Sequence, residues 1–144
     1  FLMYIIYIMM YKANIILYDG VCILCNKWVS YIIKNDKKKR FKFAPIQSKI
    51  AKNIICEIGG SSEIIDTIFL IKSDKFYTKF QASTYALYSV NKIFILLYAL
   101  NLIFPKKFLD FFYDIVGSRR YQIFGMHDTC PLPDAETKDR FIND

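Results

Sequence analysis

Two cysteines, Cys22 and Cys25, stand at CxxC spacing in a stretch that reads as a strand, a turn and the start of a helix. The apolar, β-branched run 15–18 precedes a break at Asp19-Gly20, and a helical pattern follows the cysteines. The first turn of a helix has unpaired backbone N–H groups and the positive end of the helix dipole, which stabilise a thiolate relative to a thiol. Because the thiolate is the reactive form, this position favours thiol chemistry.

The places of the two thiols on the helix predict different roles. The first sulfur of a CxxC tends to lie at the open amino end and the second about one turn inside, so Cys22 is the expected nucleophile and Cys25 the resolving thiol. Exchange would pass through a mixed disulfide on Cys22, which Cys25 then displaces. The alternatives are a pair of small buried hydrophobic residues or half of a metal site.

The nine residues 18–26, Tyr-Asp-Gly-Val-Cys-Ile-Leu-Cys-Asn, resemble the signature of the DCC family, which is named for the Asp and two Cys of DxxCxxC. Its members are predicted thiol-disulfide oxidoreductases with a thioredoxin-like fold. Further blocks resemble later family blocks in the same order, over about residues 13–134: 41–47, 66–70 and 118–131. The resemblance implies that Asp19, Cys22 and Cys25 are the motif residues. No organic cofactor is implied, since the disulfide carries the two electrons.

Composition bounds the size and setting of the protein. The 144 residues, 54% of them hydrophobic, are enough for one well-buried domain. We expect a single domain over 13–134, an apolar extension at 1–12 and a polar tail at 135–144. The net charge of +7 is diluted by apolar helices and by a Lys, Ile, Asn and Tyr bias, so we expect no nucleic-acid partner. Four cysteines, two of them isolated, make no secreted disulfide framework, and a reducing cytoplasm is expected.

The apolar, uncharged run 1–11 raises the question of a signal peptide or a membrane anchor. It has neither a basic leading region nor a typical cleavage site, and it is shorter than the roughly 20 residues of a spanning helix. Membrane association is therefore an alternative rather than the expectation, and an anchor becomes possible again if residues precede Phe1.

The periodicity of the chain predicts an α/β fold in the thioredoxin-like order βαβαββα with additional C-terminal helices. A right-handed parallel βαβ unit and an antiparallel hairpin are expected. The CxxC would lie at the end of the first strand, where ligands of open α/β sheets usually sit. The expected elements are a strand at 14–18, a helix at 22–34, a strand at 41–45, a helix at 47–58 ending at Gly59-Gly60, and strands at 67–71 and 76–78.

From residue 82 to residue 117 the chain is helical in character. The segment 93–104 is nearly all apolar but only about half a membrane span long, which favours a buried core helix over a surface-embedded one. Pro105 suits the first turn of another helix that runs to Gly117. Its apolar face would carry Phe108, Phe111, Phe112 and Ile115. These helices are expected to cover one side of the sheet.

Acidic side chains near the thiols have two interpretations. Asp19 either accepts a proton from Cys25 or tunes Cys22 through its charge, or it forms an Asx-type turn that holds the loop.

Thioredoxins place a cis proline before the third core strand, where this chain has Asp66. Asp66 and Thr67 are therefore expected to line the substrate groove with a carboxylate and a hydroxyl.

The C-terminal block carries further candidates. Arg119 and Arg120 could hold an anionic substrate or a glutathione carboxylate, and the alternative is pairing with Asp110 or Asp114.

His127 and Cys130 give H-x-x-C, which together with the CxxC would complete a Cys3His zinc set. A structural zinc-binding module, or a non-catalytic interaction module that uses these four residues, is the alternative to disulfide exchange. The exchange hypothesis itself predicts no metal ligands. Cys130 is otherwise a possible third redox thiol, and Cys56 is expected to be a buried core residue.

Overall fold

A four-stranded mixed sheet forms the centre of the computed structural model, which describes residues 14–57, 67–72, 75–128 and 138–142. The strand order is β2-β1-β3-β4, with β1 parallel to β2 and antiparallel to β3, and β3 antiparallel to β4. The predicted thioredoxin-like α/β fold, with its parallel unit and its hairpin, is confirmed. The strands are β1 (Asn14–Tyr18), β2 (Phe41–Pro45), β3 (Phe69–Lys72) and β4 (Lys75–Thr78).

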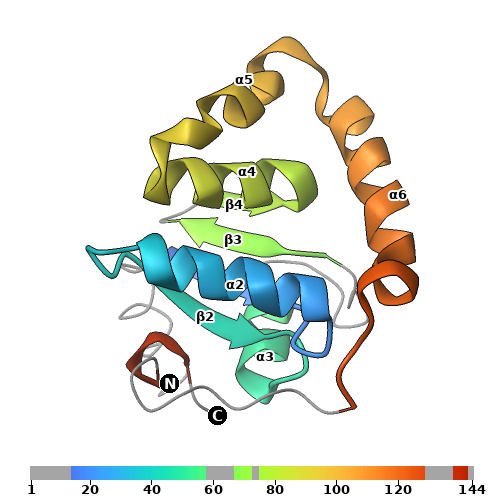
Figure 1. The fold of residues 1–144 in the computed structure, drawn as a ribbon. Coiled ribbons are helices and arrows are strands. Elements are labelled where there is room, and N and C mark those ends of the chain that lie inside the picture. Colours follow the sequence, from blue (N-terminus) through green and yellow to red (C-terminus); the bar gives the residue numbers. More distant parts are fainter. Residues whose placement is uncertain (1–13, 58–66, 73–74, 129–137, 143–144) are drawn as a thin grey trace.

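Helices lie on both faces of this sheet (Figure 1). Successive side chains of β1 point to opposite faces of the sheet. Ile16 and Tyr18 pack with α2 and α4, whereas Ile15 and Leu17 pack with α3. This is why the strand reads as a continuous apolar run rather than an alternating one. The helices are α2 (Ile23–Asn35), α3 (Lys49–Glu57), α4 (Lys79–Val90), α5 (Ile95–Ile103) and α6 (Lys106–Phe124), with short 3-10 turns at Lys92–Phe94 and Lys138–Arg140.

Helix α5 corrects the prediction of a buried core helix at 93–104. None of its residues is buried. One side of α5 packs on α4, where the Asn101 Nδ2 donates to Thr84 Oγ1 at 2.9 Å and the Tyr98 ring stacks on Tyr88. The other side faces outward, with exposed fractions of 79% for Leu96, 82% for Leu102 and 71% for Ile103, and Ile93 in the preceding 3-10 turn is 75% exposed.

Helix α6 is longer than the sequence pattern indicated. It passes through Gly117 and ends only at Phe124, where Gly125 takes a φ of 85° that favours glycine. Pro105 precedes the helix at the N-cap position. The face carrying Phe108, Phe111 and Phe112 is exposed and does not cover the sheet. Of the helices expected to cover one side of the sheet, α4 does so, through Ala82 and Ala86. No helix in the described ranges combines the length and apolar character needed to cross a bilayer.

Cys56 is exposed on α3, against the expectation of a buried residue. The helix turns Ala51, Ile54 and Ile55 toward the sheet, and Cys56 lies one position past that face. The predicted stop at Gly59-Gly60 lies outside the described residues.

Candidate active site at the start of α2

Cys22 caps helix α2. Its backbone is extended (φ −76°, ψ 124°), and its Sγ accepts a hydrogen bond from the Cys25 backbone N–H at 3.3 Å. Oxygen side chains usually fill this role, so a sulfur here receives a helix N–H that stabilises a negative charge. The Asn26 side-chain amide donates to the carbonyl oxygens of Gly20 and Cys22, at 2.7 and 2.8 Å, and fixes the turn that positions the sulfur.

The two thiols have pKa values displaced in opposite directions. A hydrogen bond from the Cys25 thiol lowers the pKa of Cys22 most; burial opposes it, and the Cys25 backbone N–H and the Arg120 charge lower it further, to about 6. The same hydrogen bond, together with burial, raises the pKa of Cys25. At neutral pH this arrangement holds a thiolate on Cys22 and a protonated thiol on Cys25.

The exposure of the two cysteine residues differs from the expectation that Cys22 lies at an open end. Cys22 is 0% exposed and Cys25 is 8% exposed. The chain after α6 returns along the CxxC loop, where Met126 forms an antiparallel bridge with Cys22. The His127 N–H donates to the Val21 carbonyl at 2.7 Å, so this segment lies directly beside the thiol loop.

Asp19 is a buried carboxylate with four hydrogen-bond donors. Its Oδ2 accepts from Arg120 Nη2 at 2.8 Å and from the Tyr121 hydroxyl, and its Oδ1 accepts from Gln47 Nε2 at 2.7 Å and from the Val21 N–H at 3.2 Å. Burial raises its pKa, but the bonds from Tyr121 and Arg120 lower it more, so the net pKa lies below the usual 3.8. The Val21 contact is the anticipated Asx-type turn, and the ion pair adds a charge interaction to it.

The two arginines of the C-terminal block are not brought together. Arg120 is buried and pairs with Asp19, not with either carboxylate proposed from the sequence, whereas Arg119 is exposed. Consecutive residues of a helix point in different directions, so only one of them reaches the site. Asp110 pairs instead with Lys106 at 2.5 Å, and Asp114 with Lys79 at 2.9 Å.

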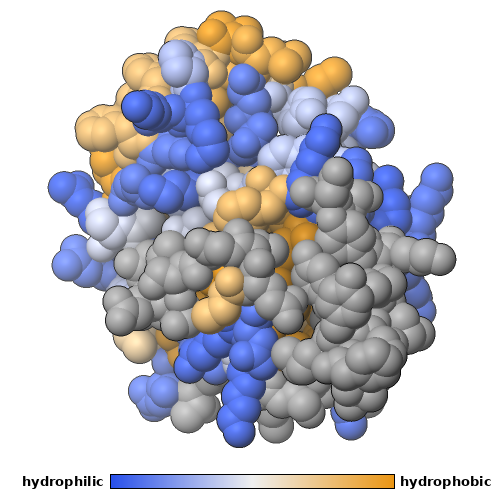
Figure 2. All heavy atoms as spheres, turned by 180° about the vertical axis from the view of Figure 1, so that it is seen from behind, coloured by the Kyte–Doolittle hydropathy of each residue, from blue (hydrophilic) through white to orange (hydrophobic). Residues whose placement is uncertain are grey.

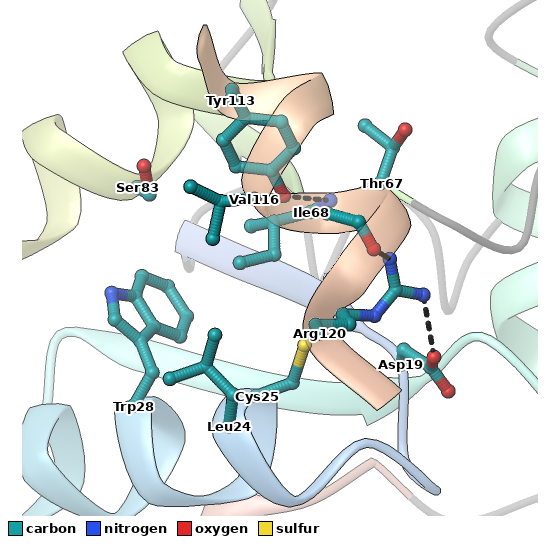
Figure 3. A pocket seen from close by; sticks show the side chains of 11 residues that line it. Asp19, Leu24, Cys25, Trp28, Thr67, Ile68, Ser83, Tyr113, Val116 and Arg120 are labelled. Atoms are coloured by element: carbon teal, nitrogen blue, oxygen red, sulfur yellow. Dashed lines mark hydrogen bonds and ion pairs between the residues drawn. The ribbon is translucent and has the colours of Figure 1, made fainter. Parts of the chain in front are cut away.

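A cavity of about 160 Å³ opens beside Cys25, whose sulfur points toward Arg120 and into the space shown in Figure 3. Thr67 lies in its lining, and Asp66 lies outside the described residues, so the substrate contacts expected of these two residues stay a prediction. Most of the lining is apolar, from α2, α6 and the segment before β3: Leu24, Trp28, Ile68, Tyr113 and Val116. The Tyr113 hydroxyl accepts a hydrogen bond from the Ile68 N–H at 3.3 Å, and burial raises its pKa.

Comparison with known proteins places this geometry in a family. A model of the DCC1-like thiol-disulfide oxidoreductases matches residues 16–126. The chain belongs to this family. It is 30% identical over 132 residues to the protein YuxK of Bacillus subtilis (strain 168), covering 90% of this chain and 93% of the relative. It is 33% identical over 122 residues to the chloroplastic DCC family protein At1g52590 of Arabidopsis thaliana, covering 84% of this chain and 70% of the relative. No solved structure matches.

Sequence reasoning missed most of the partners of the DCC motif aspartate. Gln47 and Tyr121 bind Asp19 from more than 25 residues away along the chain, and neither was proposed as a site residue. A signal was present, because both lie in the blocks 41–47 and 118–131 that resemble family blocks. A buried carboxylate needs donors, and those blocks were the places to look for them.

The Cys3His zinc set cannot be assembled from the part of the chain that the structure describes, because Cys130 lies outside it. Within that part, no group of three or more His, Cys, Asp or Glu side chains could hold a metal ion. The segment containing His127 does reach the thiol loop, through its backbone N–H.

Proposed function

We propose that Cys22 and Cys25 form a redox pair that exchanges a disulfide with the thiols of a protein or small-molecule partner. The observation that carries this proposal is the place of Cys22 at the N-cap of α2, where its Sγ accepts the Cys25 N–H at 3.3 Å with the Cys25 thiol beside it. This arrangement lowers the pKa of Cys22 and raises that of Cys25. One sulfur is held ready to attack, and its neighbour keeps a proton until a mixed disulfide has formed. Membership of the oxidoreductase family supports the same chemistry.

In the reducing direction, the Cys22 thiolate attacks one sulfur of the substrate disulfide. A Cys22–substrate bond forms, the substrate S–S bond breaks, and one substrate thiolate leaves. Cys25 then loses its proton to the first thiolate, which becomes a thiol, and attacks Cys22 Sγ. The Cys22–Cys25 bond forms, the Cys22–substrate bond breaks, and the second substrate sulfur leaves as a thiolate. Two electrons pass to the substrate, and a thiol donor reverses the sequence. No further cofactor is required.

Asp19 serves in this scheme as a positioning residue. A carboxylate with a lowered pKa is a weak proton acceptor, which argues against the role of base for Cys25. Its ion pair holds Arg120 where the guanidinium charge lowers the pKa of Cys22, although the charge of Asp19 itself opposes that effect. An anionic group of a substrate at the thiols would share the Arg120 guanidinium with Asp19, whereas the exposed Arg119 could contact only a part of the substrate that extends beyond the site.

The apolar cavity beside Cys25 would take an apolar part of the substrate, with the Thr67 hydroxyl, and Asp66 next to it in sequence, as further contacts. Because Cys22 is buried, attack also requires the packing around its sulfur to open, and the bridge to Met126 is one contact that would separate. We place this chemistry in a reducing compartment such as the cytoplasm, since the four cysteines make no secreted framework.

Single cysteine variants test the proposal. The reduced Cys25→Ser protein, treated with oxidised glutathione, should form a stable mixed disulfide on Cys22 with release of one reduced glutathione, detected by peptide mass spectrometry, while Cys22→Ser should form none at Cys25. Cys56→Ser is the matched control, because Cys56 is exposed and lies on α3, and it should behave as the unmodified protein. Thiols that stay unreactive in all three variants, or that react only after chelation, would overturn the proposal.

A further inference from the structure

Helices α5 and α6 carry an apolar surface that no described element covers. We call it the α5–α6 surface. Figure 2 shows hydrophobic residues gathered along the upper rim of the molecule, over α5 and the turn into α6. Soluble monomers rarely expose contiguous apolar patches of this kind without using them. Its exposed residues are Ile93, Ile95, Leu96, Leu97, Leu102, Ile103, Phe104, Phe108, Phe111, Phe112, Ile115 and Val116.

The charges that border α5 are basic. Residues 75–109 contain no Asp or Glu and five lysines, namely Lys75, Lys79, Lys92, Lys106 and Lys107. Two of these, Lys79 and Lys106, form ion pairs with Asp114 and Asp110 of α6. Lys92 and Lys107 are exposed at the two ends of α5, so cationic groups border its apolar face. An apolar face with basic flanks complements a surface that is apolar inside and anionic at its boundary.

The shape of the region also bears on its partner. Helix α5 lies at one extreme of the molecule, where the chain turns from α5 into α6 (Figure 1). At nine residues it is roughly 13 Å long, which suits a helix lying in a membrane interface and is too short for a span. Its polar side chain Asn101 is turned inward onto α4, leaving aliphatic residues outside.

We propose that the α5–α6 surface binds an anionic lipid bilayer. Helix α5 lies at the boundary between headgroups and acyl chains, and Lys92 and Lys107 contact the headgroups. A lipid surface is favoured over a protein partner because the outward side chains of α5 are aliphatic and offer no hydrogen-bonding group, whereas protein interfaces surround their anchors with polar contacts. The proposal does not depend on the thiol chemistry of the site.

Vesicle co-sedimentation of the full chain tests this. The reduced protein should sediment with vesicles of phosphatidylcholine and phosphatidylglycerol, and less with phosphatidylcholine alone. Leu96→Gln with Leu102→Gln should weaken binding at least about tenfold, since two outward leucines are lost. Ile93→Gln with Ile103→Gln provides a second pair, and circular dichroism checks that each variant is folded.

Charge variants test whether vesicle binding depends on the lysines that border α5 or on the positive charge of the whole protein. Lys92→Gln with Lys107→Gln should reduce binding to the anionic vesicles, and added salt should do the same. Lys37→Gln with Lys38→Gln removes the same charge from an exposed turn between α2 and β2, and should leave most of the binding.

Absence of vesicle binding would overturn the proposal. Binding that neither apolar double variant weakens would also overturn it, because another part of the chain, such as the apolar run 1–11, would then hold the bilayer. Self-association without vesicle binding, if Leu96→Gln with Leu102→Gln abolishes it, would identify a second copy of the chain as the partner.

Discussion

At the two ends of α2, buried charges meet opposite charges: Asp19, just before the helix, is paired with Arg120, and Asp36, at its C-cap, with Arg140 at 2.5 Å. Along α5 the opposite holds: apolar side chains are exposed, and no described element packs against them. Helix α6 belongs to both regions, because Arg120 reaches the thiols while Phe111 and Phe112 face outward. The comparison separates residues that maintain the fold and the thiols from residues whose role lies outside the molecule.

The largest expected effect is at the buried ion pair. Arg120→Met should lower the free energy of unfolding by about 3–5 kcal/mol, because it leaves the Asp19 carboxylate buried without its cation. Urea denaturation measures the loss. Arg119→Met, on the exposed neighbour, should stay within about 0.5 kcal/mol. Adding Asp19→Asn to Arg120→Met should recover part of the loss, and equal losses in the two single arginine variants would contradict this account.

Two leucines sharpen the contrast between the sheet and α5. Leu70→Ala, in β3, should cost about 2–5 kcal/mol through the cavity it leaves. Leu102→Ala, on the outer face of α5, should cost less than about 0.5 kcal/mol. Thermal or urea unfolding compares the same substitution at both sites. A large loss at Leu102 would mean that α5 is covered in the folded protein.

The charge on Cys22 gives a spectroscopic prediction. The ultraviolet absorbance of the thiolate in the reduced protein should rise in a step centred near pH 6, because the Cys25 thiol, the helix N–H and Arg120 lower the pKa of Cys22. Cys22→Ser should remove the step. Arg120→Met should move it to higher pH if the variant remains folded, and an unperturbed titration in the original protein would remove the basis for a poised thiolate.

A smaller effect is expected in acid. The pKa of Asp19 is lower in the folded protein than its usual value of 3.8, so its contribution to stability is present above that value. The contribution is lost as the pH falls through the lowered folded pKa. The stability difference between the original protein and Asp19→Asn should therefore shrink below about pH 3.8, as acid titration of unfolding would show. A constant difference across that range would mean that Asp19 is not a charged partner.

Local patterns predicted the sheet and the thiol loop well, because both depend on short-range signals. The apolar strand 14–18, the Asp19-Gly20 turn and the helix after Cys22 are contiguous in the sequence. The partners of Asp19 could not be found in this way, since Arg120 and Tyr121 come from about 100 residues away along the chain. The exposure of α5 was not predicted either, because an apolar helix has the same sequence pattern whether it packs inside the protein or against something outside it.

The central claim, that Cys22 and Cys25 form one redox couple, is tested most directly by a redox titration of the purified protein in glutathione buffers. Alkylation and peptide mass spectrometry would report the state of each cysteine. The account predicts one reversible two-electron transition confined to Cys22 and Cys25, with Cys56 unaffected. A pair that never forms a disulfide at any buffer ratio would contradict it.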